Sequence, residues 1–359
     1  MPTFKTLSVA ALFAMVSIPA LAQQGMRPVV DEDGTIRGEI AGVPMSSFLG
    51  EDIKTEFTRR LRESDPTSMT DGLDAVRARS DKMSKAQLDA WLKIFPSSVE
   101  ETMIDGVRTY VVTPDSGIAP ENENRVLINA HMGGFMFGSA YGGQLEAVPL
   151  AGHGGVKVIA VDYRLAPEYG YPAASEDMEA VYRHVLKTTK PENIGLYGCS
   201  AGGTLTAQMI PWLLDKGLPL PGAIGVFCSG AMSTFWFGGD SATTSALMNA
   251  SAPVSAADLD ARPRNYFEGV DQNTLFITPG EYPDVLGQYP PTLMLSGTRD
   301  IAMSNAVITH TNLLKSGARA ELFIQEGLGH GHFFLFPGTE EAATAHQVIW
   351  DFFDRHLGR

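Results

Sequence analysis

Short apolar runs recur along the chain from about residue 100 to its end, and each is followed by a polar or glycine-containing turn. Runs of this length bounded by turns predict buried strands. Their alternation with helix-like segments predicts an α/β fold, with a mostly parallel central sheet flanked by helices, over a single domain of residues 100–359. The five clearest runs are residues 125–130, 156–161, 193–197, 291–296 and 320–324.

The region before this domain, residues 23–99, is predicted to supply cap helices. Ile53, Phe57 and Leu61 have the spacing of one helix face, and Ser84-x-x-Gln87 has the pattern of a capping box that would open a second helix. The apolar face of that second helix would carry Leu88, Trp91, Leu92 and Phe95. Helices with one apolar face need a surface to cover, so we expect both to pack on the sheet domain.

A further cap or pocket insertion is predicted over residues 231–286, between two of the expected strands. Its start is rich in aromatic residues, among them Phe235 and Trp236. Aromatic side chains that flank a site commonly line its pocket, so we expect these two to contact substrate. The alternative is that the aromatic residues belong to the ordinary core.

The N-terminus has the pattern of an export signal. Lys5 supplies a positive charge, residues 6–19 are mostly apolar, and Ala20-Leu-Ala22 provides the small residues that signal peptidase requires. We therefore expect a signal peptide at 1–22, cleavage after Ala22 and a periplasmic or secreted protein without stable membrane insertion. An uncleaved N-terminal anchor is the alternative.

Charge and cysteine content narrow the partners and the chemistry. The formal net charge of −14 disfavours nucleic acid and anionic membranes as partners. Cys199 and Cys228 are the two cysteines, so the fold does not depend on disulfides. Export would permit a bridge between them, but disulfide geometry is demanding, and we favour free, partly buried thiols.

The segment Gly198-Cys-Ser-Ala-Gly202 carries the most specific chemistry. It lies between the apolar run 193–197 and a helix-like pattern that begins at Ala201. A serine on such a strand-to-helix turn has a strained backbone and a projecting hydroxyl, and the flanking glycines let strand and helix approach closely. Ser200 is the candidate nucleophile. A glycine-rich turn without catalytic function is the alternative.

A serine nucleophile needs donors for the oxyanion that develops during acyl transfer. The strand 125–130 runs into His131-Met-Gly-Gly-Phe135, where paired glycines allow backbone N–H groups to approach a ligand. Gly133 and Gly134 are therefore the candidate donors. The N–H of Ala201, at the start of the following helix, is the third. Met132 and Phe135 flank these donors and are candidate substrate contacts.

These motifs resemble those of a known family. His-x-Gly-Gly-Phe, Asp162-Tyr-Arg-Leu-Ala-Pro-Glu168 and Gly-x-Ser-Ala-Gly-Gly, in this order, are similar to the hormone-sensitive-lipase-like branch of the α/β-hydrolases, the family IV esterases of bacteria. The resemblance implies a carboxylic ester hydrolase with a helical cap. It also implies that the 162–168 loop braces the oxyanion turn through buried ion pairs, with Arg164 and Glu168 as scaffold residues.

The resemblance also indicates the remaining catalytic residues. Asp300 follows the strand 291–296, where the family has its acid, and His330 follows Glu-Gly-x-x, the family's approach to its base. His332 competes with His330. A His-x-His metal pair is the other alternative, but no further Cys, His or carboxylate cluster completes a site, and we expect neither a metal nor a cofactor.

Two positions depart from the family pattern. Met132 stands where the family usually has glycine, and Cys199 stands where it usually has Asp or Thr. Neither change removes a required backbone N–H. We therefore predict a serine carboxylesterase that acts on small esters of short- to medium-chain acids. A lactonase or aryl amidase with the same triad, a serine peptidase of this fold and a non-catalytic binding protein are the alternatives.

Overall fold

The computed structural model describes most of the chain in two compact units, Met1–Pro44 and Met45–Arg359. The first contains a short antiparallel pair, β1 (Val29–Val30) with β2 (Ile36–Arg37). The second contains all other elements. The described residues are 29–30, 32, 36–37, 43–63, 72–232, 239–248 and 266–358. The predicted signal peptide, 1–22, and the predicted pocket residues Phe235 and Trp236 lie outside them.

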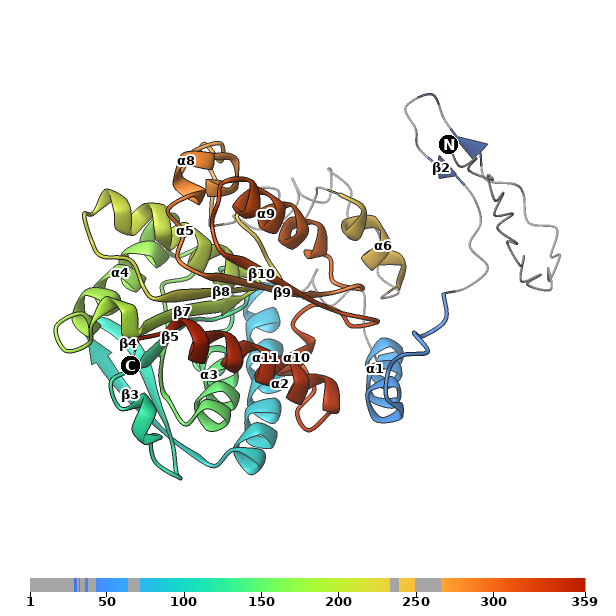
Figure 1. Cartoon of the computed structure of the whole chain (residues 1–359). Helices are drawn as coiled ribbons and strands as arrows, with labels where there is room; N and C mark the ends of the chain where they lie inside the picture. The colour runs from blue at the N-terminus through green and yellow to red at the C-terminus, as the bar shows by residue number, and fades with distance from the viewer. Residues whose placement is uncertain are drawn as a thin grey trace, which may run out of the picture. The chain divides into compact units, whose positions relative to one another are not determined.

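A sheet of eight strands forms the centre of the larger unit, in the order β10-β9-β8-β7-β5-β6-β4-β3 (Figure 1). The strands β3 and β4 form a hairpin, and β4 is antiparallel to β6, whereas all other neighbours are parallel. The predicted α/β fold with a mostly parallel sheet is therefore confirmed. The strands are β3 (Ser97–Ile104), β4 (Val107–Pro114), β5 (Val126–Ala130), β6 (Lys157–Val161), β7 (Ile194–Cys199), β8 (Ala223–Phe227), β9 (Thr292–Gly297) and β10 (Ala320–Gln325).

Helices cover both faces of this sheet. The helices are α1 (Glu51–Glu63), α2 (Leu73–Ile94), α3 (Tyr141–Gly154), α4 (Ala173–Val185), α5 (Ala201–Asp215), α6 (Asp240–Met248), α8 (Pro283–Leu286), α9 (Met303–Lys315), α10 (His332–Leu335) and α11 (Glu340–His356), with 3-10 turns at Pro120–Asn122, Pro191–Asn193 and Pro279–Glu281. Helices α2, α3 and α11 lie on one face of the sheet, and α4, α5 and α9 lie on the other (Figure 1). Their buried apolar side chains belong to two separate core clusters. None of the helices in the described ranges is long and apolar enough to cross a membrane.

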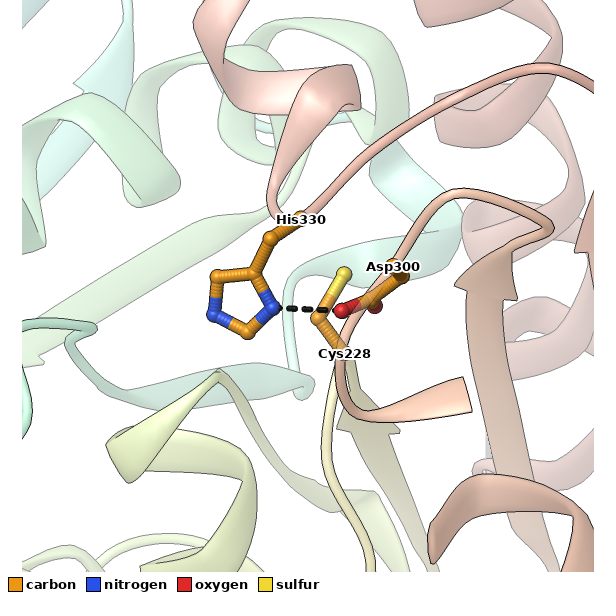
Figure 2. A group of neighbouring side chains, drawn as sticks. All are labelled: Cys228, Asp300 and His330. Atoms are coloured by element: carbon orange, nitrogen blue, oxygen red, sulfur yellow. Dashed lines mark hydrogen bonds and ion pairs between the residues drawn. The ribbon is translucent and has the colours of Figure 1, made fainter. Parts of the chain in front are cut away.

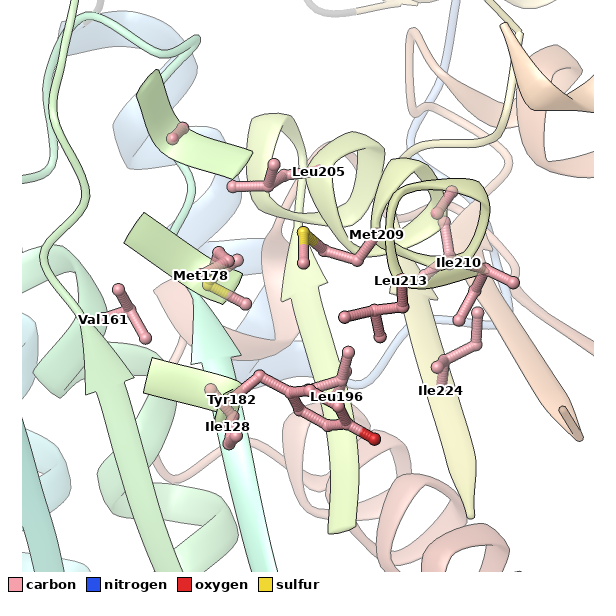
Figure 3. Packing of buried hydrophobic residues seen from close by; sticks show 14 of the residues in the cluster. Ile128, Val161, Met178, Tyr182, Leu196, Leu205, Met209, Ile210, Leu213 and Ile224 are labelled. Carbon is pink, nitrogen blue, oxygen red and sulfur yellow. The ribbon is translucent and has the colours of Figure 1, made fainter. Parts of the chain in front are cut away.

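The core is built from strands whose residues point alternately into the two layers. Every residue of β5, β7, β8 and β9 is buried, as their apolar runs predict. Figure 3 shows the layer beneath α4 and α5, where the side chains of these helices meet those of β5, β6, β7 and β8. Its labelled residues are Ile128, Val161, Met178, Tyr182, Leu196, Leu205, Met209, Ile210, Leu213 and Ile224.

The two predicted N-terminal helices are present, but one begins earlier than expected. In α1, Ile53 and Phe57 are buried and pack with Leu328 and Phe336, so this apolar stripe faces residues that follow β10. The helix α2 begins at Leu73, so the capping-box prediction at Ser84 was wrong. An N-cap residue requires a non-helical backbone, whereas Ser84 lies in mid-helix on the buried face.

Candidate active site

Three polar side chains from loops at the carboxyl end of the sheet meet in one chain of hydrogen bonds. Ser200 follows β7, Asp300 follows β9 and His330 follows β10. Ser200 Oγ lies 2.8 Å from His330 Nε2, and His330 Nδ1 lies 2.7 Å from Asp300 Oδ1. The structure thus brings together the three residues that the sequence indicated as nucleophile, base and acid.

The serine occupies a strained turn between β7 and α5. Its φ of 58° and ψ of −121° lie in a region that residues with a side chain rarely adopt. A Cβ at Gly198 or at Gly202 would collide with the main-chain carbonyl of Ala130, so both glycines are required where this turn crosses the end of β5. Ser200 is only 5% exposed. The Ser200 side chain is therefore almost entirely shielded from solvent, with its hydroxyl directed at His330.

The Asp300 carboxylate is fully buried and held in one orientation. Oδ1 accepts from the N–H of Ala302 at 2.9 Å, and Oδ2 accepts from Ser296 Oγ at 2.6 Å. Burial raises its pKa, but the neighbouring His330 and these hydrogen bonds outweigh burial and lower the pKa to about 2. An ionised Asp300 keeps the ring proton of His330 on Nδ1, which leaves Nε2 free to accept the Ser200 proton.

The competing histidine, His332, lies in a different environment. It is fully buried at the start of α10, where Nδ1 donates to the carbonyl of Gly329 at 2.8 Å and Nε2 contacts the Gln325 side chain. Burial lowers the pKa of its ring to about 4. Gly331 between the two histidines has a φ of 66°, a turn that directs the two rings to different neighbours.

The oxyanion turn follows β5, beside the nucleophile. Gly133 has a φ of 130° and Gly134 a φ of 60°, and a Cβ at Gly133 would collide with the main chain of Phe137. Within the described part of the chain, the N–H groups of Gly133 and Gly134 have no hydrogen-bond acceptor. Ala201 is the first residue of α5, where the N–H has no acceptor within the helix. These three N–H groups are the ones that the sequence indicated as candidate oxyanion donors, and that role stays a prediction.

The loop 162–168 holds this turn mainly by hydrogen bonds. Tyr163 donates its hydroxyl to the carbonyl of His131 at 2.8 Å, and its ring stacks on the His131 ring at 4.1 Å. The N–H of Ala166 donates to the carbonyl of Phe135 at 2.8 Å. The expectation that the loop braces the turn is correct, but the contacts are hydrogen bonds and ring stacking.

The expectation of buried ion pairs holds for Asp162, which is 4% exposed and pairs with Arg108. It is wrong for Arg164 and Glu168, whose side chains are solvent-accessible. Arg164 is 39% exposed and pairs with Glu176 and Asp177, and Glu168 is 51% exposed and pairs with Arg77. Charged side chains lose hydration when they are buried, and at the surface these two form ion pairs without that cost.

Arg77 of α2 was not identified from the sequence, although it contacts this turn directly. Its guanidinium donates to the carbonyl of Met136 at 2.8 Å and to that of Ala166 at 2.9 Å. It therefore joins a cap helix to both loops. An arginine on a helix surface carries no local signal of such a role.

Of the four predicted substrate contacts, the structure describes Met132 and Phe135. Met132 is partly buried against the core layer of α2 and α3. Phe135 is 6% exposed and stacks on Tyr266, with ring centroids 4.6 Å apart. Phe235 and Trp236 lie outside the described residues. Substrate contact by these four residues stays a prediction.

The two cysteines are free, buried thiols that lie next to the candidate catalytic residues. Cys228 Sγ accepts from the N–H of Gly331 at 3.2 Å, and burial raises the pKa of the Cys199 thiol to about 11. Figure 2 shows Cys228 beside Asp300 and His330, whose possible ligand atoms lie within 4.8 Å of one another. A cation there would have to displace the thiol proton and the Nδ1 proton, and so would compete with the catalytic hydrogen bond.

Known proteins with similar sequences and structures are esterases. A model of the α/β hydrolase fold matches residues 127–334, more than half of the chain. Esterase LipI of Mycobacterium tuberculosis is 28% identical over 77% of this chain and 86% of its own, and carboxylesterase NlhH of the same species is 27% identical over 79% and 91%. The crystal structure of esterase E25 superposes with a TM-score of 0.77 and 28% identity, covering 89% of this chain and 98% of that one.

Proposed function

This chain belongs to the α/β-hydrolase-fold family, and we propose that it is a serine carboxylesterase that hydrolyses short- to medium-chain esters through an acyl-enzyme. The observation that carries the proposal is the continuous hydrogen-bond chain from Ser200 through His330 to Asp300. The esterases that resemble it in sequence and in structure support the same reaction class.

In the proposed acylation step, Ser200 Oγ attacks the ester carbonyl carbon while His330 Nε2 takes its proton. Asp300 holds the ring and stabilises the imidazolium. The N–H groups of Gly133, Gly134 and Ala201 stabilise the oxyanion of the tetrahedral intermediate. His330 then protonates the departing alcohol oxygen, and the acyl group remains on Ser200.

Deacylation repeats these steps with water in place of serine. His330 takes a proton from water as the water oxygen attacks the acyl carbon, and the proton returns to Ser200 when the acid leaves. Each bond change uses groups of this chain, so the proposed reaction requires neither a metal nor an organic cofactor.

The proposed preference for short and medium acyl chains rests on apolar side chains next to the donors. Met132 stands where the family usually has glycine, and Phe135 fills space beside the turn. Each methylene that fits usefully into a pocket contributes about 0.8 kcal/mol. A narrow pocket stops this gain at a limiting chain length.

A panel of p-nitrophenyl esters with acyl chains of increasing length tests both parts of this proposal. We expect kcat/KM to pass through a maximum at a short or medium chain. A kcat/KM that keeps rising to the longest chains contradicts the narrow pocket. A lactone and an anilide in the same panel test the lactonase and amidase alternatives, since a kcat/KM above that of the best ester would reassign the substrate.

Export is part of the proposal and is supported by the sequence alone. The positive charge at Lys5, the apolar stretch 6–19 and the small residues before position 23 have the pattern of a cleaved signal. N-terminal sequencing of the protein from fractionated cells is expected to begin at Gln23 in the periplasm or medium. An intact Met1 in the cytoplasmic fraction would contradict export.

A further inference from the structure

Glu146 is a fully buried carboxyl group that the proposed reaction does not use. It lies on α3, whose residues pack on the sheet beside β5, and none of it is exposed. Burial raises its pKa to about 8, although three hydrogen bonds act in the opposite direction. No basic side chain within the described residues forms an ion pair with it. A buried, unpaired acid costs stability, so its position calls for a functional explanation.

The partners of Glu146 lie directly beside the two halves of the candidate active site. Oε1 accepts from the N–H of Met132 at 2.6 Å. The main-chain N–H of Cys199 lies close enough to this carboxyl to lower its pKa. Met132 immediately precedes the oxyanion donor Gly133, and Cys199 immediately precedes Ser200. One side chain therefore joins the turn that supplies two oxyanion donors to the turn that supplies the nucleophile.

Two further contacts fix the carboxyl group and its helix. Oε2 accepts from Asn129 Nδ2 at 3.0 Å, and the main-chain carbonyl of Glu146 accepts from the Tyr197 hydroxyl at 3.1 Å. Asn129 is on β5 and Tyr197 is on β7, the strands that end at these two turns. The carboxyl thus has N–H donors on both oxygens and little freedom to rotate.

We propose that Glu146 is a positioning residue that sets the distance between the oxyanion donors and Ser200, because it binds the N–H of Met132 and is held against β7 by the Tyr197 hydroxyl. This inference rests on the proposed function of the site. Met132 is one of the two positions at which the chain departs from the family motif. Preorganised donors are effective only when they match the position of the developing oxyanion.

The variant that tests this role most sharply is Glu146→Gln. Glutamine keeps the shape of the side chain but replaces one acceptor oxygen with an NH₂ donor. Above its pKa of about 8 the Glu146 carboxylate accepts N–H groups on both oxygens, so glutamine would replace one acceptor by a donor, and the two proteins are compared at pH 9. The turns are expected to shift apart without loss of the fold. The matched control is Glu192→Gln, which makes the same change at an exposed position.

Hydrolysis of p-nitrophenyl butyrate is measured for the full chain, and each preparation is titrated to completion with a fluorophosphonate to count working sites. For Glu146→Gln we expect kcat per titrated site to fall about 10- to 100-fold, as misplaced catalytic groups typically cause. KM is expected to change less than about threefold, and thermal unfolding to remain cooperative. The Glu192→Gln control is expected to match the wild type.

A kcat per site within twofold of the wild type in folded Glu146→Gln overturns the proposal. A fall only in the number of titrated sites, with kcat per site unchanged, overturns it too, because the role is then purely structural. If Glu146→Gln does not fold, Asn129→Ser is measured instead. It leaves the carboxyl but removes one orienting donor, so we expect about a 3- to 10-fold lower kcat, and an unchanged kcat overturns the proposal. Full activity of Ser200→Ala in this assay would contradict the proposed function instead.

Discussion

His330 and His332 are two residues apart, yet their surroundings assign them different roles. The Asp300 carboxylate orients the His330 ring toward Ser200, whereas Gly329 and Gln325 engage both ring nitrogens of His332. The residue type alone could not separate them. What separates them is the acid partner, which comes from another strand.

Replacing each histidine in turn tests this assignment. His330→Ala is expected to lower kcat nearly as much as the loss of Ser200, because triad members act as a unit. His332→Ala is expected to lower stability by about 1–3 kcal/mol, since it leaves the buried Oε1 of Gln325 without its contact to His332. It should keep most of the kcat per folded molecule.

Turnover and folded fraction are measured together for both variants. An active His330→Ala enzyme beside an inert but folded His332→Ala enzyme would transfer the base to His332.

The sequence predicted residues that stand in short motifs and missed residues that act from a distance. Ser200, Gly133 and Gly134 could be found because a turn constrains its own sequence. Glu146 and Arg77 could not, because they belong to ordinary helices and acquire their partners only when the chain folds.

Helix α2 contacts the loops around the oxyanion turn, which the sequence did not predict. The sequence predicted a cap helix starting near Ser84, but the helix begins at Leu73 and so carries Arg77 to the loops around the oxyanion turn. A capping pattern marks the start of a helix only when the residues before it are not helical. Here the residues before Ser84 also favour helix, so the pattern lies inside α2. The buried strands, by contrast, were predicted within one or two residues, since apolar runs of this length have few alternatives in a packed sheet.

Two variants distinguish the hydrogen bonds of Arg77 from its ion pair. Arg77→Met removes the bonds to the carbonyls of Met136 and Ala166, and we expect it to lower stability by about 1–3 kcal/mol and kcat/KM several-fold. Glu168→Gln removes only the half-exposed ion pair and is expected to cost less than about 1 kcal/mol.

Chemical denaturation measures the stability of each variant, and ester hydrolysis measures its kcat/KM. Equal losses in the two variants would show that the ion pair, and not the carbonyl contacts, holds the turn.

The raised pKa of Glu146 predicts how the stability of the larger unit depends on pH. Glu146 has a pKa of about 8 in the fold and an ordinary pKa near 4.5 when unfolded. Between these values the folded chain binds one more proton than the unfolded chain, so this group makes stability fall as pH rises. The neighbouring Tyr163, Tyr197 and Cys199 have raised pKa values and titrate above neutral pH. Burial lowers the pKa of His131 below its ordinary 6.5, which makes stability rise with pH in that lower range, so the contribution of Glu146 is the difference between the wild type and a variant at position 146.

Urea unfolding of wild type and Glu146→Gln at intervals from pH 5 to pH 8 checks this expectation. The wild type is expected to lose more stability across this range than the variant, in which no proton is exchanged at position 146. Parallel curves would mean that Glu146 does not titrate between these pH values.

The most direct test of covalent catalysis is to locate the adduct of a fluorophosphonate by peptide mass spectrometry. We expect one phosphonyl group per chain, on the peptide that contains Ser200, and none in folded Ser200→Ala. That variant is also expected to lose roughly 10⁴- to 10⁶-fold in ester turnover. An adduct on a different residue, or wild-type turnover by folded Ser200→Ala, would contradict Ser200 as the nucleophile.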